Sequence, residues 1–133
     1  MTSFPEQPAT PGPARPTHRR TTNASRDIAD VPSVELISTT ALHLMSAAAV
    51  HLGLAEDLAD HHDLDEARTL IESLAGLVVA ASPRLGHHHA APLRDGLRTL
   101  QLAFREASTV PDAPGEAPGE RITGPVYPAA TQA

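Results

Sequence analysis

Apolar residues recur at helical spacing in three separate stretches of the chain. This spacing places them on one face of an α-helix in each stretch, as expected for helices that share a core. The first stripe consists of Ile37, Ala41, Leu44, Met45, Ala48 and Leu52. The second consists of Ala67, Leu70, Ile71, Leu74, Val78 and Ala81, and the third of Leu93, Leu97, Leu100, Phe104 and Ala107. The pattern predicts an all-α fold, a small three-helix domain over residues 30–110.

Start and stop signals place the three helices at about residues 31–52, 64–82 and 91–108. Asp30 is expected to cap the first helix and Gly53 to end it. The second helix has the clearest start, because Asp63 and Glu66 form a variant of the capping box. Pro83 is expected to help close this helix, and Pro92 to lie in the first turn of the third.

The segments outside these stripes have compositions that do not build a core. Residues 1–29 form an arm rich in Pro, Thr and Arg, and residues 111–133 a tail rich in Pro and Gly, so both are predicted to be disordered. Within the tail, residues 121–128 contain unexpected apolar side chains. One interpretation is that these side chains are incidental or pack back onto the domain. The other is that they form a short peptide that docks in a partner groove, with Tyr127 as its anchor. The docking candidates are Arg121, Ile122, Gly124, Pro125, Val126 and Tyr127.

The composition limits the class of protein. The chain has 133 residues and no Cys, and it lacks the pattern of a signal peptide, which predicts a cytoplasmic location. A domain this small buries a thin core, so a homo-oligomer is expected. The net charge is −6, and the chain has two Phe, one Tyr and no Trp. An acidic, aromatic-poor core argues against direct nucleic-acid binding by the core.

The first helix carries no formal charge between Leu36 and Leu54, which raises the question of a membrane span. Serine, threonine and histidine residues dilute this stretch, so no membrane association is expected. The three alanines at residues 47–49 instead favour close approach of another helix. Leu102, Val50 and Val79 lie off the main stripes and are candidates for a second, intermolecular apolar surface.

Histidines form the one group that could carry chemistry. His61 and His62 precede the second helix, and His87, His88 and His89 precede the third. Imidazoles near carboxylates suit Zn²⁺ or Ni²⁺. The two groups fall at opposite ends of an up-down-up bundle, however, so solvated loop histidines are the favoured interpretation, and no metal or cofactor is expected. His43 and His51 are interpreted as structural, and no Ser, His and carboxylate combination indicates a catalytic site.

The core resembles a known family. The run Ala49-Val-His-Leu-Gly53, the segment Asp63-Leu-Asp-Glu-Ala-Arg68 and the end of the third helix, Leu100-Gln-Leu-Ala-Phe104, are similar to the small bacterial domain-of-unknown-function family eighteen forty-four. The likeness covers about Leu36 to Ala107, and the longer actinobacterial form also resembles the tail from Gly119 to Tyr127. This resemblance implies an all-helical fold and supplies no catalytic residue. The family's genes often lie near that of a translation initiation factor, which implies a ribosome-associated partner. Other members tend to start the last helix with Thr-Pro-Glu, where this chain has the His87–His89 run.

Two functions follow as hypotheses. The first is a non-enzymatic cytosolic interaction or adaptor protein that self-associates through apolar and small-residue faces and reaches a protein partner with its arm and tail. The second is a histidine-rich metal-binding protein. Removal of residues 87–89 distinguishes them, because only the second function requires these side chains.

Overall fold

The computed structural model describes residues 28–126. The chain divides into two units, of which the second runs from Val34 onward. In the first unit, residues 28–30 form a helical turn. Most of the predicted disordered arm, residues 1–27, lies outside the described residues.

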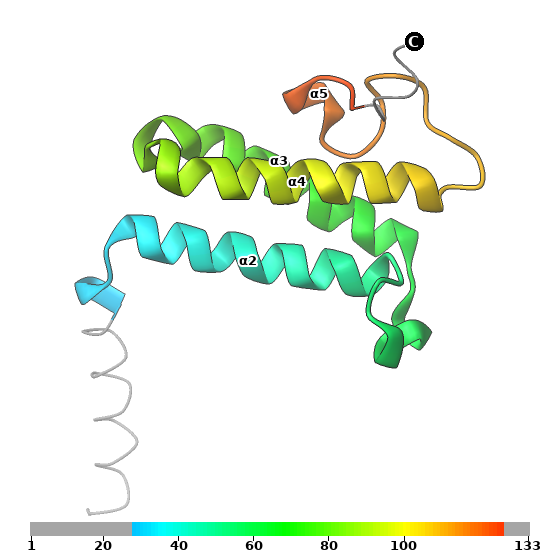
Figure 1. The fold of residues 1–133 in the computed structure, drawn as a ribbon, viewed down its shortest axis with the longest axis horizontal. Coiled ribbons are helices and arrows are strands. Elements are labelled where there is room, and N and C mark those ends of the chain that lie inside the picture. The colour runs from blue at the N-terminus through cyan, green and yellow to red at the C-terminus, as the bar shows by residue number, and fades with distance from the viewer. Residues whose placement is uncertain (1–27, 127–133) are drawn as a thin grey trace, which may run out of the picture. The chain divides into compact units, whose positions relative to one another are not determined.

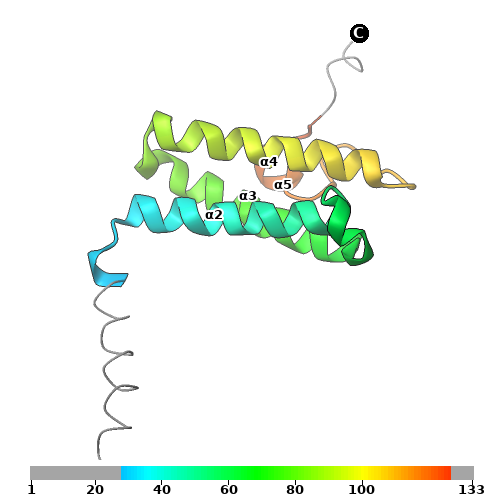
Figure 2. The ribbon, with the colours of Figure 1, turned by 60° about the horizontal axis from the view of Figure 1, so that its bottom comes forward.

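Three long helices build the second unit, and the prediction of an all-α, three-helix fold is confirmed. They are α2 (Ser33–His51), α3 (Leu64–Leu85) and α4 (His87–Ala107), with the short 3₁₀ helix η2 (Glu56–His61) between α2 and α3. The helices lie side by side in an up-down-up arrangement, so that α2 and α4 run in the same direction (Figures 1 and 2). Within residues 28–126 there is no β-strand.

The predicted ends of α2 are close to those observed. Asp30 lies in the preceding helical turn, so it does not cap the helix as the sequence suggested. At the other end, Gly53 has a φ of 82° and donates its N–H to the carbonyl of Val50, as expected for a helix stop. The N–H of Asp63 then donates to the carbonyl of His51 over 2.8 Å, which ties the start of α3 to the end of α2.

The start of α3 confirms the predicted cap. One carboxylate oxygen of Asp63 accepts from the backbone N–H groups of Asp65 and Glu66 at 3.1 and 3.2 Å. The end differs from the prediction, because the helix continues past Pro83 to Leu85. Proline removes only the hydrogen bond to the carbonyl of Val79. The last residue, Leu85, is buried in the core and keeps this turn in place.

The beginning of α4 corrects the sequence prediction by four residues. Gly86 alone joins α3 to α4, with a φ of 80°. The backbone N–H of Ala90 donates to the carbonyl of Gly86 over 2.9 Å, and Ala90 is completely buried. The chain therefore enters the new helix at His87, and Pro92 lies beyond the first turn. Residues 87–89 are helical rather than part of a loop.

The core lies between the three helices, and the predicted stripes supply most of it. From α3 come Ile71, Leu74 and Val78, all within 1% of full burial, and from α4 come Leu97 and Phe104. The contribution of α2 is smaller, because only Ala41 and Ala48 of its residues are fully covered. Met45 of α2 lies against Gly96 of α4, where a side chain on the glycine would collide with the thioether. Packing of α2 thus relies on small residues.

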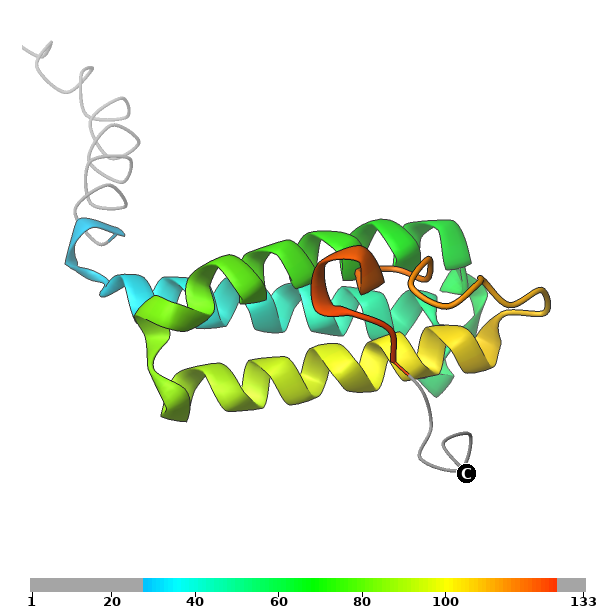
Figure 3. The ribbon, with the colours of Figure 1, turned by 90° about the horizontal axis from the view of Figure 1, so that it is seen from above.

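The predicted disordered tail is corrected for residues 111–126, which we call the clasp. The clasp includes the short helix α5 (Glu120–Thr123) and lies over α3 and α4 on the face turned away from α2 (Figures 1 and 3). Two of its own apolar side chains, Ala117 and Val126, are buried. Specific side-chain contacts order this segment in spite of its composition. Residues 127–133 lie outside the described part of the chain.

Candidate functional site

A buried ion pair holds the clasp on α4. Arg105 donates from Nε and Nη2 to the two carboxylate oxygens of Glu120 at 2.6 and 2.7 Å, in a bidentate arrangement. The side chain of Glu120 is fully buried and that of Arg105 is 15% exposed. Although Arg105 lies off the apolar stripe of α4, its side chain is therefore largely shielded from solvent.

The environment of Glu120 favours its charged form. Burial alone would raise the pKa of this carboxyl. The hydrogen bonds from Arg105 and from the N–H of Gly115, together with the positive charge of Arg105, outweigh the effect of burial. The pKa of Glu120 is therefore lowered. The guanidinium also donates to the carbonyls of Asp112 and Ala113, so one arginine fixes both ends of the clasp's first loop.

Two further contacts attach the clasp. The buried side-chain amide of Gln101 donates to the carbonyl of Pro118 and to the hydroxyl of Thr123, both at 3.1 Å. On the α3 side, Arg68 pairs with Asp112 at 3.1 Å while its guanidinium carbon lies 4.9 Å from the centre of the Phe104 ring. Every buried side-chain nitrogen or oxygen in the described residues has a hydrogen-bond partner.

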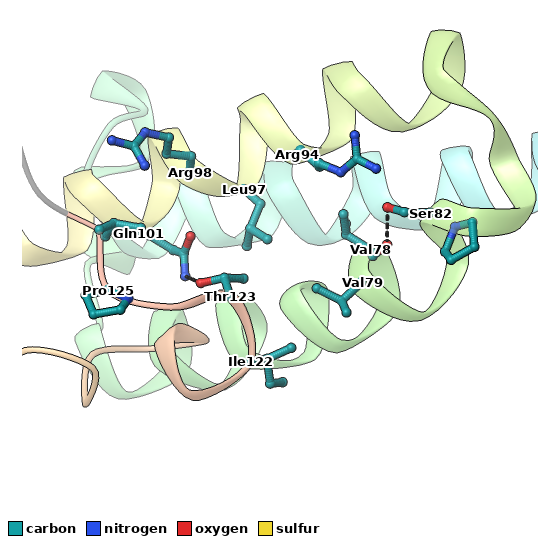
Figure 4. Close-up of a pocket in the computed structure, with 12 residues that line it drawn as sticks. Val78, Val79, Ser82, Arg94, Leu97, Arg98, Gln101, Ile122, Thr123 and Pro125 are labelled. Carbon is teal, nitrogen blue, oxygen red and sulfur yellow. Dashed lines mark hydrogen bonds between the residues drawn. The ribbon is translucent and has the colours of Figure 1, made fainter.

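The clasp closes one side of a cleft of about 470 Å³, which we call the arginine cleft (Figure 4). The other two sides are α3 and α4. The lining side chains are Val78, Val79, Ser82 and Pro83 from α3, Arg94, Leu97, Arg98 and Gln101 from α4, and Ile122, Thr123, Pro125 and Val126 from the clasp. This volume lies in the range of small-molecule sites.

Five of the six docking candidates of the tail lie in the clasp, and the sixth, Tyr127, follows it in the sequence. Val126 is buried, so here the alternative of packing back onto the domain is supported. Arg121 is exposed and pairs with Glu116 at 2.6 Å. Ile122 and Pro125 line the arginine cleft, and Gly124 follows α5 with a φ of 89°. Tyr127, the proposed anchor, lies outside the described residues.

The outer face of α2 exposes apolar side chains. Leu36 and Leu42 are 47% and 55% exposed. The exposed residues Thr39, His43 and Ser46 share this side of the helix. By length and composition, α2 is the one helix among residues 28–126 that is long and apolar enough to cross a membrane.

The other predicted apolar surface is not assembled. Val79 lines the arginine cleft, whereas Leu102 lines a separate hollow with Leu54, Thr99 and Ala103. Val50 is half-buried on α2. The three positions therefore do not form one surface.

The histidines are distributed along the fold without forming a ligand set. His61 is the last residue of η2, and His62 follows it. His87, His88 and His89 lie in the first turn of α4. Within residues 28–126, no three side chains of the metal-binding types converge on one point. His51 has a structural contact, because its Nδ1 donates to the carbonyl of His61 over 2.7 Å. This bond fixes the proton on Nδ1.

Sequence reasoning missed the residues that hold the clasp. One of them left a signal: Gln101 follows Leu97 by four residues, so a polar side chain falls on the apolar stripe of α4. Such a residue needs a buried hydrogen-bond partner. Glu120 left no comparable signal, because it lies in a Pro- and Gly-rich segment without periodicity.

One protein-family model matches the part of the chain that forms the three long helices. Residues 33–106 match the family model of DUF1844, a domain of unknown function, and this range is more than half of the chain. The match covers α2, α3 and α4 up to its penultimate residue, and it ends before the clasp. No curated protein and no solved structure matches the chain.

Proposed function

The chain belongs to the DUF1844 family, and we propose that it is a non-enzymatic, cytoplasmic interaction protein that self-associates through the outer face of α2. The observation that carries this proposal is the exposure of Leu36 and Leu42 on a helix that buries only two of its own residues. The two leucines lie on either side of the exposed Thr39 on this face of the helix, and exposed apolar side chains on one face are typical of contact surfaces.

The charge of this face supports self-association. Glu35 is the one formally charged residue in α2, so two copies of the helix meet without like-charge repulsion over most of their length. A helix of 19 residues is about 28 Å long. A standard interface buries roughly 800 Å² per partner, so a dimer through α2 would use most of the length of this helix. A twofold arrangement places α2 against its own copy.

The arrangement of the charged side chains favours a non-enzymatic role. Glu120 and Arg105 bind each other, and the clasp covers both of them. The structural hydrogen bond of His51 likewise uses a side chain that could otherwise serve as an acid or base.

The test is the molar mass of the full chain in solution over a wide concentration range. We expect a dimer for the natural sequence and a monomer for the double variant Leu36→Glu/Leu42→Glu, because carboxylates would be buried at the contact. The matched control is Val110→Glu, which places the same charge at a valine that is 82% exposed and outside α2. Circular dichroism establishes that all three proteins keep their helices.

Two results would overturn self-association through α2. One is a natural chain that stays monomeric at high micromolar concentration, and the other is a double variant with unchanged mass. A vesicle flotation experiment tests whether α2 binds lipid instead of a second copy of the chain. If the monomeric chain floats with phospholipid vesicles and Leu36→Glu/Leu42→Glu does not, then α2 binds lipid rather than a second copy.

A ribosome-associated partner is the second element of the proposal, and it rests on the family resemblance alone. Sedimentation of a cell extract through a sucrose gradient tests it. We expect part of the chain to travel with the ribosomal fractions. If the whole population stays at the top of the gradient, the link to translation is rejected while self-association is unaffected.

A further inference from the structure

The arginine cleft has an uneven distribution of charge. Among the residues that the structure describes, Arg94 and Arg98 are the only charged ones that line it, although the chain as a whole carries a net charge of −6. Within residues 28–126, Arg94 takes part in no ion pair. Figure 4 shows the two arginines extending in opposite directions along α4, on either side of Leu97. The cleft is therefore a place of positive charge on an acidic protein, which favours an anion.

The wall opposite the arginines is apolar and uncovered. Val79 of α3 and Ile122 of α5 are 45% and 50% exposed, and the floor includes the buried side chains of Val78 and Leu97. Figure 4 shows Val79 and Ile122 on the side of the cleft away from the arginines. A bound molecule thus meets a charged rim on one side and aliphatic carbon on the other.

The uncharged side-chain donors of the lining already have partners inside the protein. The hydroxyl of Ser82 donates to the carbonyl of Val78 at 2.6 Å. The amide nitrogen of Gln101 is bonded to Pro118 and Thr123, and the hydroxyl of Thr123 donates to the carbonyl of Gly124. Recognition of a ligand by this cleft therefore depends on charge and apolar contact rather than on these groups.

We propose that the arginine cleft binds a small aliphatic carboxylate. Its carboxylate lies at Arg94, and its hydrocarbon chain covers Leu97, Val79 and Ile122. A charged head and an apolar body match the two sides of the cleft, and the volume of about 470 Å³ accommodates a chain of medium length. Because the clasp forms one wall, the ligand binds only the docked clasp and stabilises it by mass action.

Titration of the full chain with octanoate tests the proposal, with 1-octanol as a neutral compound of the same chain length. Both are used below the concentration at which they aggregate, and binding is followed by the backbone amide signals in NMR spectra. We expect saturable binding of one octanoate, with shifts confined to the cleft, at Val79, Leu97 and Ile122. Binding of 1-octanol is expected to be about tenfold weaker, because it lacks the charge-assisted contact.

Arginine variants test the position of the carboxylate. Arg94→Gln should weaken octanoate binding about tenfold and leave 1-octanol unchanged. The matched control is Arg84→Gln on α3, which removes an equal charge from an exposed position outside the cleft and should change neither ligand. Equal affinity for octanoate and 1-octanol, or an equal effect of the two arginine variants, would overturn the proposal, as would the absence of octanoate binding at millimolar concentration.

Variants of the apolar wall and of the clasp complete the test. Val79→Asp should abolish octanoate binding by placing a carboxylate in the wall, whereas Val110→Asp should leave it intact. Octanoate should also slow hydrogen exchange at the clasp residues Glu120 and Ile122 in the natural chain. Shifts centred on the outer face of α2, or exchange at the clasp unaffected by saturating octanoate, would show that the ligand binds elsewhere.

Discussion

Gly119 of the clasp and Ala75 of α3 are in direct backbone-to-side-chain contact: a Cβ atom added to Gly119 would lie 2.8 Å from the Cβ of Ala75. The same added atom would lie 3.0 Å from the amide nitrogen of Gln101, which is the group that anchors Pro118. Gly119 also has a φ of 78°, in the left-handed region. The clasp reaches α3 because this position has no side chain.

Replacement of Gly119 by alanine should release the clasp. The new methyl group cannot be accommodated by Ala75, and the left-handed backbone adds a further cost of about 1–2 kcal/mol. The control is Gly115→Ala, where φ is 83° but no atom lies within 4 Å of the added Cβ. Hydrogen exchange should accelerate at Glu120 and Ile122 much more in Gly119→Ala than in Gly115→Ala. Equal acceleration would mean that backbone strain, rather than the contact with Ala75, decides docking.

Docking of the clasp should depend on pH through Glu120. Its pKa is lowered in the docked state, so the docked clasp disfavours protonation. The stabilisation is therefore complete above the ordinary pKa of a glutamate, about 4.3, and is lost as the pH falls through the lowered value. The amide signal of Gly115, which donates to Glu120 at 2.8 Å, should report the release.

The variant Glu120→Gln tests the assignment of this transition. It should weaken docking at neutral pH, by about 3 kcal/mol as for a buried ion pair that loses one partner, and remove the acid transition. Glu116→Gln removes an equal charge from an exposed pair with Arg121 and should leave the transition in place. An acid transition that persists in Glu120→Gln would assign the pH dependence to another carboxyl.

Two glycines in helix interiors should respond differently to alanine. Gly76 of α3 has no atom within 4 Å of an added Cβ, so Gly76→Ala should raise the free energy of unfolding by about 0.5–1 kcal/mol. At Gly96 of α4, the added atom would lie 2.8 Å from the sulfur of Met45, and this side chain must move. Urea denaturation should therefore show a smaller gain, or a loss, for Gly96→Ala. Equal gains would show that Met45 moves aside without cost.

The histidines of α4 provide a test against the metal-binding alternative. His87, His88 and His89 are exposed in the first turn and contribute nothing to the core. Replacement of all three by alanine should leave the oligomeric mass unchanged, with the same native mass spectrum as the natural chain at low micromolar Zn²⁺. An integral zinc count that disappears in the variant would instead favour the metal-binding function.

The sequence was a good guide where structure is local. The apolar stripes predicted the inner faces of all three helices, and Asp63 predicted the start of α3 because its capping bonds span only three residues. Pro83 and the histidine run misled the prediction of helix ends. In both cases a buried residue nearby, Leu85 or Ala90, holds the backbone helical where the local signal pointed to a loop.

The clasp could not be predicted because its order comes from distant residues. Arg105 and Glu120 are fifteen positions apart, and Arg68 and Asp112 are forty-four apart. Composition describes the Pro- and Gly-rich segment correctly as unable to build its own core, but it does not reveal that α3 and α4 supply one. The arginine cleft was missed for the same reason, since the clasp forms one of its sides.

The family match stops at residue 106, whereas the clasp begins at residue 111. A relative whose chain ends with the last helix has no carboxylate for an arginine at the position of Arg105 and no carbonyl for an amide at that of Gln101. Evolution is then free to replace both side chains, and we expect them to be inherited together with the appended segment. A family member without such a segment would lack one wall of the cleft, and we therefore expect it to bind no ligand there.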